Sequence, residues 1–332
     1  MQKLDVSVIG VGHLGSLHAK MYSQLGCANL VGIFDVDGEK ARNVARELGT
    51  KAFGTIDEAI EASDAVSIVT TTVAHYETAD RSLRHGVHTF IEKPITETIE
   101  QARSLVALAE EKHLKIQVGH IERFNPAILA LESYELKPLF IESHRLAQFN
   151  PRGSDVAVVL DLMIHDIDLI LSLVKSPVAR IDANGVAVVS DTADIANARI
   201  QFHNGCVANV TASRISQQKM RKMRLFQQDA YISIDFAQGI AEVFRLVDEG
   251  DSHAKPTMLL GKIDQGTRKR EIIYEQPEVK EVNALKYELE LFVLAVINDK
   301  QPPVNGHDGM QALEVAREIL QRIDAQKIKL SP

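Results

Sequence analysis

The sequence predicts a two-domain α/β protein in which a doubly wound parallel sheet is followed by an open, mostly antiparallel sheet. Up to about residue 120, short runs rich in valine and isoleucine alternate with amphipathic helical patterns. Beyond that point the runs become longer, alternate apolar and polar residues, and are joined by hairpin signals such as Asn204-Gly205. The first pattern is typical of βαβ units, and the second pattern is typical of an α+β domain with an antiparallel sheet.

The first third of the chain contains five predicted strands. In chain order they are DVSVIG, ANLVGIFD, AVSIVT, VHTFIE and LKIQVGH. Helical patterns between them include residues 37–48 and 100–112. Because parallel strands need crossover connections, we expect helices on both faces of this sheet.

The rest of the chain begins with a helical segment, PAILALESY, and continues as predicted strands. These are LFIESHRLAQF, ARIDANGVAVVS, ANARIQF, GCVANVTASRI, AYISIDF and IAEVFRLV. Two helical patterns, at about 281–298 and 308–325, follow them. We therefore predict a first domain at residues 1–122 and a second domain at residues 123–332.

The composition favours a small-molecule partner. A chain of 332 residues with 45% hydrophobic content can bury two sizeable cores, and its formal charge of −8 argues against nucleic-acid and membrane-surface partners. No apolar run reaches the roughly 18 residues of a spanning helix or resembles a signal peptide, so we expect a cytoplasmic protein. Cys27 and Cys206 lie far apart in the sequence, which fits a reducing compartment.

A glycine motif follows the first predicted strand, in VIGVGHLGSLHAKMY. Gly10, Gly12 and Gly15 form G-x-G-x-x-G at the start of a helix, where the backbone can approach a pyrophosphate and the helix terminus attracts it. The next strand ends at Asp35, near the spacing at which a carboxylate accepts hydrogen bonds from the adenosine ribose. Together these features predict a Rossmann domain that binds a dinucleotide; the alternative is a tight turn without a ligand. Val36 in place of an adjacent arginine favours NAD over NADP.

The predicted cofactor contacts share one location, the carboxyl ends of the parallel strands, where doubly wound sheets bind ligands. They are Gly10, Gly12, His13, Leu14, Gly15, Asp35, Val36, Thr70, Thr71, His75, Glu92 and Lys93. In FIEKPITET, Pro94 restricts the backbone beside Lys93, so we predict that this lysine points toward the nicotinamide. A solvated surface lysine is the alternative.

Five motifs carry a family resemblance. They are the glycine motif, Asp35, EKP at 92–94, GHIERFNPA at 119–127 and DLMIHDIDL at 161–169. In this order they resemble the glucose-fructose oxidoreductase/inositol dehydrogenase/MocA (Gfo/Idh/MocA) family. The resemblance covers essentially the whole chain. It implies hydride transfer between a nicotinamide cofactor and a sugar or cyclic-polyol carbon, and a second-domain sheet that often makes oligomer contacts. It also implies that Lys93, Asp161 and His165 match the lysine, acidic and histidine positions of the family motifs.

The chemistry of alcohol oxidation suits these three residues. His165 is a predicted base, because a histidine titrating near neutrality can remove the hydroxyl proton as the hydride leaves. Asp161, four residues earlier, would share its helix face and orient the imidazole or approach the substrate. The Lys93 ammonium would stabilise negative charge on the reacting oxygen, whereas Asp166 and Asp168 would point elsewhere and serve the structure.

Two other interpretations of Asp161 and His165 are a helix-surface pair and half of a metal site. The sequence has no HExxH motif and no clustered cysteines, so we predict no metal.

The predicted substrate contacts are Arg123, Asn125 and Arg214. Arg123 is either a substrate contact or part of a structural ion pair, and Asn125 precedes a proline that indicates a helix start. Arg214 begins the basic stretch SRISQQKMRKMRLF, which could grip a phosphate, form a solvated loop or contact another subunit. GHxERFNP with a downstream ASR most resembles the family branch acting on UDP-N-acetylhexosamines and their uronates, which implies oxidation of a ring secondary hydroxyl at C3.

Three functions therefore stay open on the sequence. The first is an NAD-dependent dehydrogenase of such a nucleotide sugar, and the second is a dehydrogenase of a free polyol or sugar such as inositol. The third is a non-catalytic NAD-binding regulatory protein, against which the presence of Lys93, Asp161 and His165 argues. We expect a homodimer or homotetramer through the second-domain sheet, without nucleic-acid or membrane partners.

Overall fold

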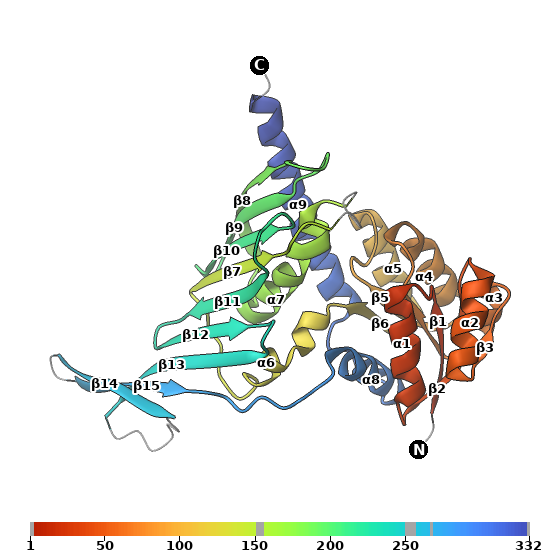
Figure 1. Ribbon diagram of the computed structural model, residues 1–332, viewed down its shortest axis with the longest axis horizontal. Helices are drawn as coiled ribbons and strands as arrows, with labels where there is room; N and C mark the ends of the chain where they lie inside the picture. Colours follow the sequence, from red (N-terminus) through yellow and green to blue (C-terminus); the bar gives the residue numbers. More distant parts are fainter. Residues whose placement is uncertain (1–2, 151–155, 250–256, 266–267, 331–332) are drawn as a thin grey trace. The chain divides into compact units, whose positions relative to one another are not determined.

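The chain divides into two compact units in the computed structural model (Figure 1). Unit 1 comprises Met1–Ile121 and Asn283–Glu314, and unit 2 comprises Glu122–Val282 and Val315–Pro332. Each unit is built on one sheet. No helix among the described residues is long and apolar enough to cross a lipid bilayer. The structure describes residues 3–150, 156–249, 257–265 and 268–330.

Unit 1 contains a six-stranded parallel sheet in the order β3-β2-β1-β4-β5-β6. Its strands are β1 Leu4–Ile9, β2 Ala28–Phe34, β3 Lys51–Ala52, β4 Ala65–Ile68, β5 His88–Glu92 and β6 Ile116–Gly119. The winding direction reverses between β1 and β4, which makes their carboxyl ends the switch point where such sheets bind ligands. The predicted doubly wound sheet is confirmed; the two-residue β3 was not predicted.

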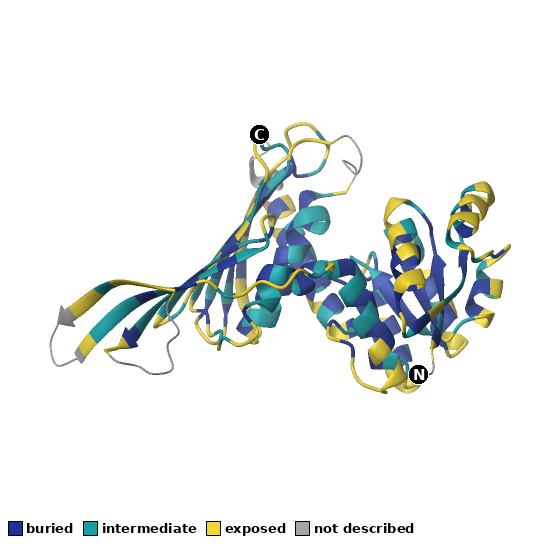
Figure 2. Cartoon of the chain, turned by 60° about the horizontal axis from the view of Figure 1, so that its bottom comes forward, coloured by how far each residue is buried: buried dark blue, intermediate teal, exposed yellow. Residues whose placement is uncertain are grey.

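Helices cover both faces of this sheet. They are α1 His13–Gln24, α2 Gly38–Leu48, α3 Ile56–Glu61, α4 His75–Arg84, α5 Ile99–Glu111 and α8 Ala284–Ile297, with a 3₁₀ turn, η1, at Thr72–Ala74. The start of α2 follows from its sequence, because the Asp37 carboxylate caps the helix. Thr98 and Gln101 form a capping box at the start of α5. Figure 2 shows these helices with exposed outer faces and the strands buried between them.

The helix α8 returns from late in the sequence to complete unit 1. Phe292 of α8 lies edge-on to Phe90 of β5, with ring centroids 5.8 Å apart, and shares a buried cluster with Tyr22 of α1. The sequence analysis placed all of residues 123–332 in the second domain, whereas the structure places Asn283–Glu314 in unit 1. The difference arises because α8 buries its apolar side chains on the parallel sheet, a partner that its own sequence pattern does not identify.

Unit 2 contains a nine-stranded sheet in the order β14-β15-β13-β12-β11-β7-β10-β9-β8. Its strands are β7 Phe140–Leu146, β8 Val178–Val186, β9 Ile195–Phe202, β10 Val207–Ser213, β11 Met220–Phe226, β12 Ala230–Asp235, β13 Ile240–Asp248, β14 Met258–Gln265 and β15 Arg268–Glu275. Strands β7 and β10 pair in parallel, and the other neighbours are antiparallel. The predicted mostly antiparallel sheet is therefore confirmed.

The basic stretch divides into a loop at residues 214–219 and the strand β11, which was not predicted. Met223 and Leu225 are buried, whereas Lys222 and Arg224 between them are exposed. This alternation is the period of a half-buried strand, and the high charge of its outer face obscured it. Strands β14 and β15 were likewise not predicted.

Unit 2 also contains the helical segments that carry its predicted site residues. They are the 3₁₀ turn η2 Ile121–Phe124, α6 Pro126–Leu129, the π-helical turn η3 Val159–Met163, α7 Ile164–Val174 and α9 Gly306–Leu330, which begins in unit 1. The segment PAILALESY was expected to be helical throughout, but only its first four residues form α6. Helix α7 packs on the face of the sheet formed by β7 and β10.

Candidate functional site

The glycine loop between β1 and α1 leaves an open cradle at a helix amino terminus. Gly10 has φ of +89°, and a Cβ atom there would lie 2.7 Å from the Val69 carbonyl oxygen. A Cβ atom at Gly15 would lie 1.8 Å from the Gly10 oxygen, so both positions require glycine. At Gly12, by contrast, a Cβ atom would meet only Lys40 Nζ, at 3.8 Å, within 4 Å. The open space before α1 fits the pyrophosphate of a dinucleotide.

Asp35 connects the end of β2 to this glycine loop. Its Oδ2 accepts a hydrogen bond of 2.8 Å from Val11 N, and its Oδ1 accepts one of 2.9 Å from Asp37 N. The carboxylate is thereby held in one orientation beside the cradle, as its predicted role toward the adenosine ribose requires.

A cavity of about 470 Å³ opens beside Asp35. Val36 and Arg42 line it, and Lys40 Nζ lies 3.6 Å from Asp35 Oδ2. These two cations were not predicted from the sequence, where only the chain neighbour Val36 bore on the cofactor preference. The available signal was their closeness in the chain to the end of β2, because both lie in the first turns of α2, which starts directly after Asp37.

The loop after β4 carries Thr70, Thr71 and His75. Thr70 is half-buried and Thr71 is exposed, whereas His75 is buried. His75 Nδ1 lies 2.9 Å from the Pro94 carbonyl oxygen, and its Nε2 lies 3.2 Å from the Thr70 carbonyl oxygen. Burial lowers the pKa of His75, although the two carbonyls oppose this shift. His75 thus joins the loop after β4 to the turn that follows Lys93.

Lys93 stands directly after β5, at the carboxyl edge of the parallel sheet. Its side chain is half-buried, and the Lys93-Pro94 peptide bond is cis. Glu92 turns its carboxylate inward, where Oε1 lies 3.2 Å from Nε2 of the buried His18. His18 was missed by the sequence analysis; its place on the inner face of α1, three residues after Gly15, was the available signal.

Asp161 and His165 lie in unit 2 on consecutive helical segments. Asp161 belongs to the π-helical turn η3, and His165 is the second residue of α7. The sequence analysis assumed one α-helix through both residues, whereas the π turn changes the angle between their side chains. Such π-helical turns are frequent at functional sites because they redirect one side chain.

The two acids that follow His165 anchor α7. Asp166 accepts hydrogen bonds of 2.8 and 2.9 Å from Arg145 of β7. Asp168 accepts hydrogen bonds of 2.7 and 2.6 Å from Arg123. Both carboxylates are buried, so these bidentate pairs agree with the structural role expected for Asp166 and Asp168. Arg123 forms the ion pair of one interpretation, and its role toward a substrate stays a prediction.

The other predicted substrate contacts also have partners within unit 2. Asn125 caps α6, accepting a 3.1 Å hydrogen bond from Ala127 N. Arg214 is only 5% exposed, lies 3.6 Å from Asp194, and donates a hydrogen bond to the Val156 carbonyl. Their roles toward a substrate stay predictions.

Acidic side chains pair with the strand part of the basic stretch. Arg221 lies 3.4 Å from Glu122, and Lys222 lies 3.1 Å from Asp235. Arg224 of the same strand pairs with Glu142 at 3.3 Å. These pairs offset much of the positive charge that the sequence suggested.

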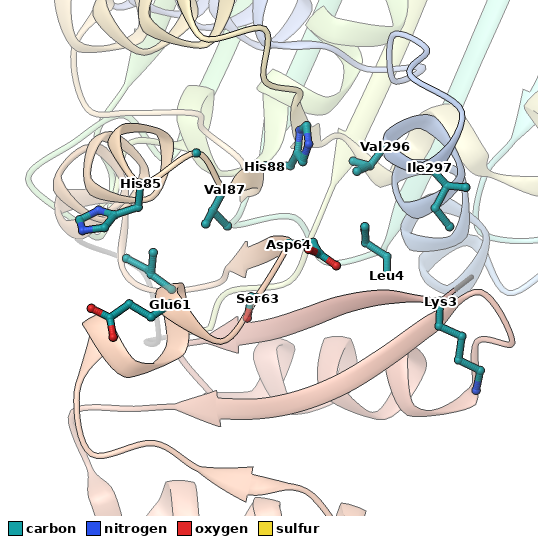
Figure 3. Close-up of a pocket in the computed structure, with 12 residues that line it drawn as sticks. Lys3, Leu4, Glu61, Ser63, Asp64, His85, Val87, His88, Val296 and Ile297 are labelled. Atoms are coloured by element: carbon teal, nitrogen blue, oxygen red, sulfur yellow. The ribbon is translucent and has the colours of Figure 1, made fainter. Parts of the chain in front are cut away.

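A second cavity of unit 1 lies at the opposite edge of the parallel sheet (Figure 3). It measures about 500 Å³, and its lining includes Leu4, Asp64 and His88, at the amino ends of β1, β4 and β5. It is therefore remote from the carboxyl ends that carry the cradle. Among the described residues, no group of three or more histidine, cysteine or acidic side chains could hold a metal ion.

The comparisons with known proteins match both parts of the chain. Residues 4–120 match the oxidoreductase family with an NAD-binding Rossmann fold, and residues 141–235 match the GFO/IDH/MocA C-terminal domain. UDP-N-acetylglucosamine 3-dehydrogenase of Acidithiobacillus ferrooxidans is 43% identical over 245 residues, which cover 74% of this chain and 78% of that protein. Scyllo-inositol 2-dehydrogenase (NAD(+)) of Bacillus subtilis is 29% identical over 229 residues, which cover 63% of this chain and 67% of that protein.

Solved structures agree with these sequence matches. UDP-N-acetylglucosamine 3-dehydrogenase GnnA from Acidithiobacillus ferrooxidans superposes with a TM-score of 0.87 at 36% identity, covering 98% of this chain and 99% of that chain. Scyllo-inositol dehydrogenase from Lactobacillus casei with bound NAD(H) and scyllo-inositol shares the fold, with a TM-score of 0.77 at 19% identity and 98% coverage of both chains. With the glycine cradle and the two matched domains, the chain belongs to the Gfo/Idh/MocA family of NAD-dependent oxidoreductases.

Proposed function

We propose that this protein oxidises a ring secondary hydroxyl, at C3, of a UDP-N-acetylhexosamine or its uronate, giving a keto sugar and NADH. The observation that carries the proposal is the 43% identity to a UDP-N-acetylglucosamine 3-dehydrogenase, against 29% for an inositol dehydrogenase. The structural likeness has the same order, with TM-scores of 0.87 and 0.77. The proposal places the enzyme in the cytoplasm, where NAD and nucleotide sugars are available.

In the proposed mechanism, His165 removes the proton of the C3 hydroxyl while the Lys93 ammonium donates a hydrogen bond to the same oxygen. Bound NAD supplies the acceptor for the hydride that leaves C3. Asp161 orients the imidazole of His165. The anchoring of α7 by Arg145 and Arg123 supports this assignment, because a general base must be held in a fixed position.

The UDP group gives the substrate a charged part remote from the reacting carbon. Binding energy from a diphosphate can position C3 for hydride transfer. We assign Arg123, Asn125 and Arg214 to this substrate region. Because Arg214 is paired with Asp194, its contribution would come from shaping the region or from exchanging this partner for phosphate.

The substrate proposal is tested by initial rates of NADH formation. UDP-N-acetylglucosamine, its uronate, free N-acetylglucosamine and myo-inositol would be compared by kcat/KM with the unmodified protein and with Arg214→Ala. We expect the UDP sugars to be clearly preferred and the substitution to weaken them selectively. A better rate with myo-inositol would favour the free-polyol dehydrogenase, to which more distant relatives correspond.

The proposed catalytic roles are tested by Lys93→Met and His165→Asn. Each should lower kcat by roughly 10²-fold or more, with little loss of NAD affinity, because each removes a group that acts in the transition state. Asp161→Asn should lower kcat by a smaller factor if Asp161 only orients His165. The exposed Lys112→Met and His203→Asn serve as matched controls. Near-normal turnover in the first two variants would contradict the assignment and mean that other residues carry the chemistry.

We also propose that the protein forms a homodimer or homotetramer through the unit 2 sheet. The observation behind this is an aromatic ladder that crosses five neighbouring strands on one face, with ring centroids 5.0 to 5.7 Å apart. The ladder consists of Phe140, Phe226, Tyr231, Phe244 and Tyr274. Phe140 and Arg145 are five residues apart in β7, so their side chains point to opposite faces of the sheet. Because Arg145 contacts α7, the ladder lies on the face opposite to this helix.

A further inference from the structure

A line of buried polar groups lies beneath the carboxyl end of β5, next to Lys93. His18 of α1 is completely buried, with its Nδ1 3.0 Å from Ser67 Oγ and its Nε2 3.2 Å from Glu92 Oε1. The Phe90 ring packs edge-on against the imidazole, with centroids 5.4 Å apart. The hydrogen bond at Nδ1, the charge contact at Nε2 and the ring contact with Phe90 together hold the imidazole in one orientation.

The Glu92 carboxylate is fixed from several sides. Oε1 faces His18, and Oε2 accepts a 3.2 Å hydrogen bond from the backbone N–H of Lys93. On β6, Gly119 leaves room for it, since a Cβ atom there would lie 2.7 Å from Oε1. The Glu92 side chain is only 12% exposed. The charge of the neighbouring Lys93 is one of the causes that favour the ionised form of this carboxylate.

The surroundings keep this carboxylate charged. Burial raises the pKa of Glu92, but the contact with His18 and the charge of Lys93 lower this pKa by more, so the net direction is downward. Among the described residues, Tyr22 of α1, Glu288 of α8 and His75 of α4 also interact with this line of groups. Burial, and then the charges of Glu288 and Glu92, raise the pKa of Tyr22, so its hydroxyl stays neutral.

We propose that His18 is a positioning residue for the reaction: it holds Glu92 ionised at the end of β5, and this fixed negative charge keeps Lys93 protonated and aligned. The inference rests on the proposed role of Lys93 in stabilising the reacting oxygen. Loss of the His18 donor leaves Glu92 buried without its partner, which favours the protonated carboxyl. Lys93 then loses a neighbouring negative charge, and its ammonium form becomes less favourable.

The test compares His18→Leu with His18→Gln. Leucine removes the donor to Glu92, whereas glutamine keeps an N–H that can reach it. In the protein without cofactor, NMR titration of lysines labelled at the ε carbon, assigned with Lys93→Arg, reports the pKa of Lys93 directly. We expect His18→Leu to lower this pKa by about one unit and His18→Gln to restore most of it.

In His18→Leu, the alkaline limb of the pH profile of kcat/KM should move to lower pH, because this limb reports loss of the Lys93 proton. The acid limb, assigned to His165, should not move. His88→Gln is a matched control, because His88 begins the same strand and faces the remote cavity. Circular dichroism would show that each variant is folded.

If His18→Leu does not fold, Glu92→Gln provides a second test. This substitution removes the carboxylate charge at nearly constant side-chain size, and it should also lower the pKa of Lys93. An unchanged Lys93 titration in the folded His18→Leu or Glu92→Gln protein would overturn the inference. The titration needs no substrate, so it is separable from the proposed function. An enzyme inactive on UDP sugars would refute that function and leave this measurement valid.

Discussion

At the scale of single residues, we expect Asp35 to decide how the adenosine end of the cofactor is recognised. Its carboxylate is fixed by Val11 N and Asp37 N, which suits ribose hydroxyls and opposes a 2′-phosphate. Lys40 and Arg42 beside it weaken this discrimination, because they can offset the phosphate charge. NAD should therefore bind more tightly than NADP, by a margin that these two cations reduce.

We expect Lys40→Ala and Arg42→Ala to weaken NADP more than NAD and so to raise the ratio of their affinities. Asp35→Ser combined with Val36→Arg should instead narrow or reverse the preference. Fluorescence titration with NADH and NADPH measures each affinity, and Arg46→Ala on the exposed side of α2 is the control. Equal affinities in the unmodified protein would contradict the role given to Asp35.

His75 should make the folded protein sensitive to mild acid. Its pKa is lowered from 6.5, chiefly by burial, so below pH 6.5 the unfolded chain takes up a proton that the folded chain resists. The stability that His75 contributes is thus present above its unfolded pKa and declines as the pH falls through 6.5 toward the folded value. His75→Gln should lose this dependence.

The measurement is the difference in unfolding free energy between the unmodified protein and His75→Gln, by urea titration between about pH 5.5 and 7.5. The difference should shrink as the pH falls. The exposed His85→Gln should show no comparable trend. A difference independent of pH would mean that His75 does not titrate in this range.

At the scale of elements, α7 depends on a buried ion-pair network. Arg145 of β7 donates to Asp166 and, at 2.9 Å, to Glu122, and all three side chains are almost completely buried. Removing the cation would deprive the buried Asp166 carboxylate of its ion-pair partner and leave Glu122 with Arg221; breaking a buried pair typically costs about 3 to 5 kcal/mol. The helix that carries His165 would lose its anchor to the sheet.

We therefore expect Arg145→Met to lower the unfolding free energy by about 3 to 5 kcal/mol, and Arg145→Lys to lose less because it keeps the charge without the planar fork. Arg180→Met breaks the exposed pair with Asp182 and should leave the unfolding free energy nearly unchanged, because solvent screens such a pair. Urea denaturation followed by circular dichroism gives the values. Similar losses in Arg145→Met and Arg180→Met would refute the anchoring role.

At the scale of the whole molecule, the aromatic ladder on the unit 2 sheet predicts the state of assembly. Phe226 is 37% exposed within this ladder, and a glutamate there would place a charge in a dry interface. We expect Phe226→Glu to shift the protein toward monomers in size-exclusion chromatography with light scattering. NAD affinity should persist, because the cradle lies in unit 1.

The matched control is Leu294→Glu, since Leu294 on α8 of unit 1 has the same exposure of 37%. It should leave the assembly unchanged. An unmodified protein that runs as a monomer at high concentration would rule out the proposed oligomer.

The sequence determined the class of fold and most of the cofactor cradle, because these depend on local rules. Strand-helix alternation predicts a parallel sheet, and its topology brings the strand ends together whatever the surface residues are. Gly10 and Gly15 could be identified for the same reason. A backbone position with no room for a Cβ atom requires glycine, which can be recognised in the sequence. Asp35 and Lys93 were found as strand ends.

Only the tertiary structure decided which distant residues become partners. Arg123 pairs with Asp168, 45 positions later in the sequence, and His18 contacts Ser67, 49 positions later. At such separations, hydrophobic periodicity does not indicate which residues become partners. The placement of α8 in unit 1 has the same origin, because an apolar helix face specifies burial without specifying its partner. Specific partners follow from close packing and from the cost of leaving buried polar groups unsatisfied, and both are properties of the assembled chain.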